Sequence, residues 1–217
     1  MPSDIKGILT GSQPPEYSTE LEKIVNLIAE KYTEGQHITV ARELINVAPV
    51  QLNTHPDGAL VMWLNALRSN KASVLDSLLG ADDLNETQRE RLYQYAVNCK
   101  NELGLQFFIV ALPKALQRSN DHSYLDLAVR TSSEIAELAI SNDDRAKLCD
   151  SIIPTLPELS GEHLVTLIRL IRQLGGRGAL ERDTQTITIM DDDALSIVVQ
   201  EMPDSRALKK ALEDRRD

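Results

Sequence analysis

The fold class follows from the stretch STELEKIVNLIAEKY, residues 18–32. Its apolar residues recur at spacings of three and four, which places them in one stripe of a helix with about 3.6 residues per turn. The stripe consists of Leu21, Ile24, Val25, Ile28 and Tyr32. Thr19 and Glu22 have the spacing of a capping box, in which each side chain accepts from the other residue's backbone N–H. We therefore expect an amphipathic helix that begins at Thr19.

Comparable helical patterns continue as far as residue 174, and Pro, Gly or Asn/Asp clusters separate them. Asn85 and Gln88 form a second predicted capping box, and Ser160 is placed to cap the last of these helices. The predicted helices cover 38–48, 58–69, 74–79, 86–103, 105–118, 123–140, 142–153 and 161–174. This density of helical periodicity predicts an all-α protein.

Two of these segments are apolar around most of the helix, which is typical of helices enclosed by neighbours. They are 105–112, with the sequence LQFFIVAL, and 164–174. The first could also be a buried strand, but its continuation to Arg118 and the lack of partner strands favour a helix, with a kink near Pro113. It is far shorter than the roughly 20 apolar residues that cross a bilayer, so we expect no membrane association.

The chain is expected to contain four parts. Residues 1–17 form a flexible arm, 18–174 the helical body, 175–192 a glycine-containing break and 193–217 a C-terminal helical segment with a charged tail. Within the break, Thr and Ile alternate over 184–190, which predicts a lone strand or hairpin with Ile187 and Ile189 on one face. A lone strand leaves two alternatives open: the segment is disordered, or it pairs with a strand of a partner or of another copy of the chain, and the β-branched residues favour pairing. Asp191 to Asp193 are placed to cap the helix that follows.

Two architectures fit this helical pattern. Predicted helix centres near residues 26, 63, 93, 131 and 167 are separated by about 30–38 residues, a spacing that resembles helical-hairpin repeats of the tetratricopeptide or HEAT kind. The resemblance is limited to spacing, because no consensus residues recur between the units. An irregular helical bundle with short links fits equally well. The sequence leaves both a stacked hairpin array and a bundle open.

Composition places the chain among soluble globular proteins. It has 217 residues, of which 42% are hydrophobic and 26% charged. The two cysteines, Cys99 and Cys149, fall on inward helix faces and are interpreted as reduced core thiols. No signal-like apolar segment follows Met1. We expect a cytoplasmic protein, although a substrate of a signal-less secretion route has the same appearance.

The search for catalytic chemistry is negative. The histidines (His37, His55, His122 and His163) are far apart, with no second histidine or cysteine three or four positions away, and no zinc, EF-hand, P-loop or nucleophile-elbow motif occurs. The Asp pairs at 82–83 and 143–144 precede helices and are interpreted as caps. Gly175 and Gly176 are interpreted as a helix stop. We therefore predict no catalytic residue, no cofactor and no metal site.

Charge identifies the candidate binding residues. The net charge is −10, yet residues 161–180 carry a local excess of arginine. Arg169 and Arg172 share a helix face, and Arg177 and Arg182 follow in the break. These residues suit an acidic groove, a phosphate or a nucleic-acid backbone, although the acidic body as a whole opposes binding of a polyanion.

These patterns favour a non-enzymatic protein–protein interaction module, such as an adaptor, scaffold, inhibitor or effector-type protein. Helical arrays and bundles expose grooves that accept partner segments. The expected partner is a protein, and homo-oligomerisation is a further expectation. The alternative is a nucleic-acid-associated protein that uses the Arg169–Arg182 region, acting as a multimer. A second alternative is an enzyme with a site assembled from scattered carboxylates and histidines.

Overall fold

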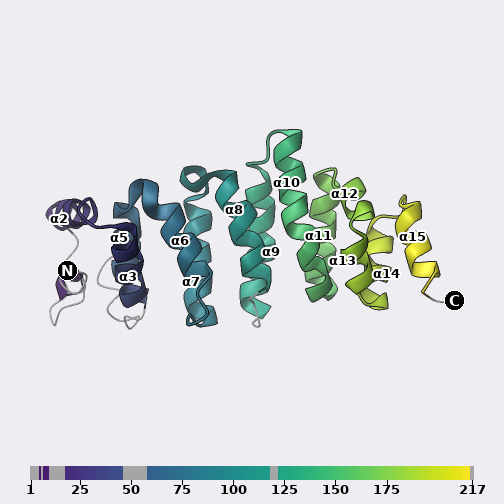
Figure 1. Ribbon diagram of the computed structural model, residues 1–217, viewed down its shortest axis with the longest axis horizontal. Coiled ribbons are helices and arrows are strands. Elements are labelled where there is room, and N and C mark those ends of the chain that lie inside the picture. Colours follow the sequence, from purple (N-terminus) through teal and green to yellow (C-terminus); the bar gives the residue numbers. More distant parts are fainter. Residues whose placement is uncertain (1–4, 6, 10–17, 46–57, 118–121, 216–217) are drawn as a thin grey trace. The chain divides into compact units, whose positions relative to one another are not determined.

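The computed structural model describes residues 5, 7–9, 18–45, 58–117 and 122–215, without the side chains of 117 and 122–125. Every regular element within these ranges is a helix, which confirms the all-α fold class (Figure 1). The chain divides into two compact units, Met1–Gln88 and Arg89–Asp217. Parts of the predicted body thus fall in both units. Ile5 and Leu9, within the predicted arm, are helical and buried.

Unit 1 is built around the buried indole of Trp63. Its elements are α2 (Thr19–Ala29), α3 (Glu34–Ile45), α5 (Gly58–Ala66), η1 (Arg68–Asn70) and α6 (Lys71–Leu79). Trp63 Nε1 donates to the carbonyl of His37 at 3.1 Å, and His37 Nε2 donates to the carbonyl of Ala29 at 2.9 Å. These bonds join α2, α3 and α5 inside the core, where an unpaired polar group would be costly.

The first helix begins at Thr19 as predicted, but its capping residue and its buried face differ from the prediction. Ser18, not Thr19, is its N-cap, and the Ser18 side chain accepts from the backbone N–H of Leu21 at 3.1 Å. The buried face consists of Leu21, Val25 and Ala29, whereas Ile24 is 46% exposed. Ile24 lies three residues and Val25 four residues after Leu21, and both spacings fit a helical stripe. Periodicity alone therefore could not decide which of the two side chains faces the core.

The main contacts in unit 2 join helices that are one to three elements apart along the chain. α9 contacts α8 and α11, α11 contacts α14, and α14 contacts α15, so these helices lie side by side (Figure 1). These contacts are consistent with both a stacked hairpin array and an irregular bundle. The elements are α7 (Glu86–Asn98, which begins in unit 1), α8 (Lys100–Gln117), α9 (His122–Ala136), α10 (Asn142–Ile152), η2 (Ile153–Glu158), α11 (Gly161–Gln173), α12 (Arg177–Arg182), α13 (Thr184–Ile189), α14 (Asp192–Glu201) and α15 (Arg206–Glu213).

Two predicted caps are confirmed. Asn85 and Gln88 exchange hydrogen bonds between side chain and backbone N–H, at 2.9 and 3.0 Å, as a capping box requires. Asp191 accepts from the backbone N–H of Ala194 at 2.7 Å and caps α14. Ser160 occupies the N-cap of α11, but its side chain makes no capping hydrogen bond.

Helix α8 confirms the helical interpretation of residues 105–112 and contains an unpredicted break. The non-helical residue is Gly104, with φ 72° and ψ 168°, whereas Pro113 lies inside the helix. This combination of angles is essentially restricted to glycine. The break at Gly104 was not predicted from the sequence, and the kink near Pro113 stays a prediction.

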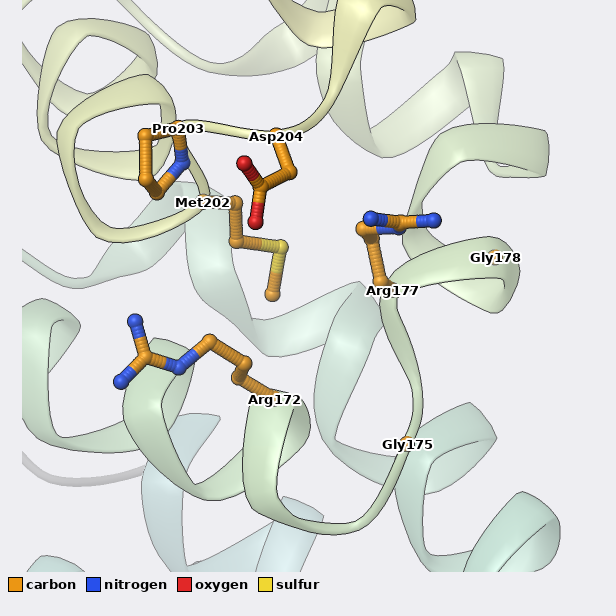
Figure 2. A pocket seen from close by; sticks show the side chains of 7 residues that line it. All are labelled: Arg172, Gly175, Arg177, Gly178, Met202, Pro203 and Asp204. Atoms are coloured by element: carbon orange, nitrogen blue, oxygen red, sulfur yellow. The ribbon is translucent and has the colours of Figure 1, made fainter.

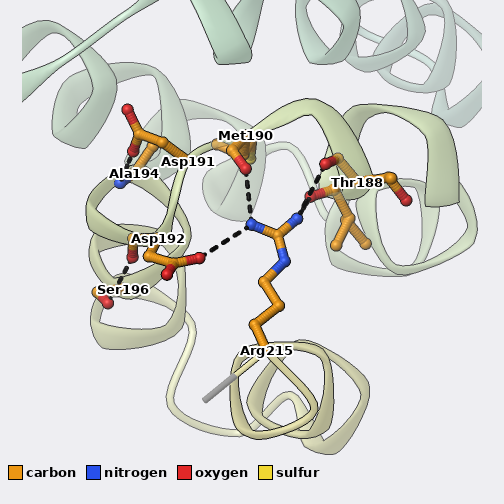
Figure 3. Close-up of polar contacts among 8 residues, drawn as sticks. Thr188, Met190, Asp191, Asp192, Ala194, Ser196 and Arg215 are labelled. Carbon is orange, nitrogen blue, oxygen red and sulfur yellow. Dashed lines mark hydrogen bonds and ion pairs between the residues drawn. The ribbon is translucent and has the colours of Figure 1, made fainter. Parts of the chain in front are cut away.

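The predicted strand at 184–190 is wrong, because Thr184–Ile189 forms helix α13. Asp183 caps it by accepting from Thr186 N at 3.0 Å. At its other end the guanidinium of Arg215 donates to the carbonyls of Met190 at 2.6 Å and Thr188 at 3.1 Å, and to that of Ile187 (Figure 3). Helix ends leave such carbonyls without intrahelical partners, so Arg215 supplies the missing donors. The strand pairing expected for Ile187 and Ile189 therefore does not apply.

Candidate functional site

A cleft in unit 2 contains two of the four predicted arginines. It has a volume of about 460 Å³ and lies between the end of α11, the start of α12 and the turn from α14 to α15 (Figure 2). We call it the arginine cleft. Its lining residues are Arg172, Gly175, Arg177, Gly178, Met202, Pro203 and Asp204.

The turn after α11 positions both arginines at the cleft. Gly175 has φ 77°, the N–H of Gly176 donates to the carbonyl of Ile171 at 2.8 Å, and that of Gly175 donates to the carbonyl of Arg172 at 3.0 Å. This is a Schellman motif, in which glycine accepts the left-handed conformation at little cost. The predicted helix stop is therefore present at this position.

Gly176 also lies against the interior of the unit. A Cβ added to it would lie 2.4 Å from Cys149 Sγ and 2.9 Å from Ile171 Cγ2. Only a residue without a side chain fits so closely. The chain therefore turns tightly over Cys149 and starts α12 at Arg177, beside the end of α11.

The opposite wall comes from residues that follow α14. Met202 is buried, with 2% exposure, whereas Pro203 and Asp204 are exposed. Figure 2 shows Asp204 and Met202 projecting toward the space that the two arginine side chains border. The cleft therefore combines two cationic groups, one carboxylate and an apolar surface.

Hydrogen bonds to Glu201 hold the α11 arginines in place. Arg169 donates from Nε and Nη2 to the two carboxylate oxygens of Glu201, both at 2.9 Å, and Arg172 Nη1 donates to the Glu201 carbonyl at 2.9 Å. The bonds from Arg169 lower the pKa of the Glu201 carboxyl below its usual range. Arg169 is thus committed to a bidentate ion pair, whereas Arg172 is anchored at the rim of the cleft.

The other predicted site residues are dispersed. Arg177 Nε lies 3.6 Å from Glu181 Oε1, one helical turn away, and Arg182 is exposed at the end of α12, outside the cleft lining. Ile187 is buried, with 9% exposure, and Ile189 is 62% exposed. The structure therefore brings Arg172 and Arg177 to one cleft. The Arg182 guanidinium lies beside Gly178 of the lining, within 3.4 Å of where a Cβ on Gly178 would be, whereas Ile187 and Ile189 lie outside the lining.

Sequence reasoning missed the wall formed by Met202, Pro203 and Asp204, and the hydrogen bonds of Glu201 beside it. Pro203 predicts that a helix ends near it. It does not indicate which part of the protein the end of that helix contacts. Sequence reasoning also missed Arg215, which lies in the segment interpreted as a charged tail.

The described histidines and carboxylates do not assemble into an apparent metal site. His37 is buried in unit 1, and His163 pairs with Asp126 between α11 and α9. His55 lies outside the described residues, as does the side chain of His122. Among the side chains that the structure describes, no group of three or more His, Cys, Asp or Glu residues could hold a metal ion.

None of the helices in the described ranges is long and apolar enough to cross a bilayer. Comparisons with protein-family models, with curated proteins and with solved structures found no match.

Proposed function

We propose that the protein is a protein-interaction module whose arginine cleft binds an acidic segment of a partner protein. The observation that supports this most is the presence of two guanidinium groups on one cleft in a chain of net charge −10. Arginine suits this role because its planar fork matches a carboxylate. A guanidinium carries several N–H donors, so Arg172 can hold the Glu201 carbonyl and bind a ligand carboxylate at the same time.

The cleft composition specifies the ligand further. Its volume of about 460 Å³ accommodates a few side chains of a peptide. Pro203 and the small accessible part of Met202 offer an apolar surface. The charged lining residues are two arginines and Asp204, and Glu181 lies 3.6 Å from Arg177 outside the lining. The best ligand is therefore a segment with Asp or Glu next to an apolar residue, not a polyanion, which the acidic remainder of the chain repels.

A random peptide library displayed on phage tests this proposal. Selection on the full-length protein should enrich sequences in which Asp or Glu neighbours an apolar residue. Binding of the enriched peptides should weaken as salt rises, because the contributing charges are exposed. Failure to enrich any sequence, or enrichment of basic sequences, would contradict the proposal.

A further inference from the structure

Helix α2 in unit 1 carries an apolar face that the unit itself does not cover. Ile24 is 46% and Leu27 58% exposed. They are three residues apart and therefore lie on the same side of the helix, whereas Leu21, Val25 and Ala29 form the buried face. Two large apolar side chains side by side in solvent are a candidate interaction surface.

Opposite charges stand at the two ends of this face. Glu20 lies four residues before Ile24, and Lys31 lies four residues after Leu27; both are exposed. The helical turn extends to Lys31, whose backbone N–H donates to the Ile28 carbonyl at 3.0 Å. The four residues Glu20, Ile24, Leu27 and Lys31, here called the α2 stripe, therefore form one line with an acidic start, an apolar centre and a basic end.

We propose that the α2 stripe binds the same stripe of a second copy of this chain, with the two helices antiparallel about a two-fold axis. The Glu20–Lys31 pair and the Ile24–Leu27 pair share one midpoint, between residues 25 and 26. Antiparallel pairing about that point sets Ile24 against Leu27 of the partner subunit, and Glu20 against Lys31 of the partner subunit. Each of these two pairings occurs twice in the dimer, as a two-fold interface requires.

The order of the charges along the α2 stripe favours a second copy of this chain as the binding partner. A parallel pair would place Glu20 beside Glu20 and Lys31 beside Lys31, which is unfavourable. In the antiparallel pair each charged residue of the stripe faces an opposite charge, and each apolar residue faces an apolar residue. An 11-residue helix offers only a small contact area. The dimer therefore belongs with weak complexes and forms at high protein concentration.

Analytical ultracentrifugation of the full chain tests this interface. Between about 10 and 500 µM at low salt we expect a reversible shift from monomer to dimer, since affinities in this range are typical of small interfaces. Leu27→Glu should leave a monomer throughout, because it places a carboxylate in the apolar centre. The matched control is Ile140→Glu, which adds the same charge at a side chain that is 86% exposed in unit 2. It should leave the dimer unchanged.

A charge exchange distinguishes this pairing from nonspecific association. Glu20→Lys and Lys31→Glu should each raise the dimer dissociation constant about tenfold, because each converts two attractions into two repulsions. The double variant restores both attractions and should return to within about threefold of the native value. Circular dichroism confirms that each variant is folded. A protein that is monomeric at the highest concentration, a dimer unaffected by Leu27→Glu, or a double variant without recovery would overturn the proposal.

Discussion

Replacement of Leu167 by Asp is expected to unfold unit 2. Leu167 has 0% exposure and lies on α11, which contacts both α9 and α14. A carboxylate at this position is removed from water without a partner, which costs several kcal/mol or forces the carboxyl to bind a proton. Since domains of this size are stable by only about 5–15 kcal/mol, this change removes a large part of the total. Thermal melting followed at 222 nm measures it.

Leu167→Met is the matched control for this substitution. It keeps the apolar character and nearly the volume of the side chain, so it should cost less than about 1.5 kcal/mol. If Leu167→Asp melted cooperatively within a few degrees of the native protein, α11 would not be enclosed. The account of unit 2 would then be incorrect.

The second large effect is expected at the arginine cleft. Arg177→Glu should weaken binding of a selected acidic peptide by about 10- to 100-fold, because an attraction becomes a repulsion at the binding surface. The fold should tolerate this change, since Arg177 is the first residue of α12 and an acidic residue suits the start of a helix. Isothermal titration calorimetry measures the dissociation constant.

Arg130→Glu provides a control that changes the net charge by the same amount elsewhere in unit 2. Arg130 lies on α9, is exposed and does not line the cleft. Its replacement should change the dissociation constant by less than about threefold, since long-range effects of one surface charge are screened by salt. Equal losses in the two variants would indicate that only net charge matters, and the cleft would then have no specific role.

The helices and several of their ends could be predicted from sequence because these features depend on local patterns. The capping box of Asn85 and Gln88 involves residues three positions apart, and the glycines after α11 determine its end directly. Gly104 illustrates the limit of such reasoning. An isolated glycine in an apolar run can lie inside a helix at a modest cost in stability, or it can break the helix. The local sequence pattern does not distinguish these two cases.

Residues 184–190 could not be predicted from their own composition. The alternation of Thr and Ile favours a strand, but Asp183 caps the helical form and Arg215 provides donors to its last carbonyls. Arg215 is 27 residues from Thr188, so no local pattern reveals the contact. The arginine cleft shows the same limit, since Arg172 and Arg177 are close in sequence but the wall with Asp204 is not.

Photo-cross-linking tests the central proposal, that the arginine cleft is the binding site, most directly. A selected peptide with a diazirine on its apolar residue would be irradiated with the full-length protein, and the tryptic fragments analysed by mass spectrometry. The account predicts adducts in fragment 183–206, at Met202 or Pro203, and their loss in Arg177→Glu. Adducts concentrated in any other fragment, or adducts that persist in Arg177→Glu, would contradict it.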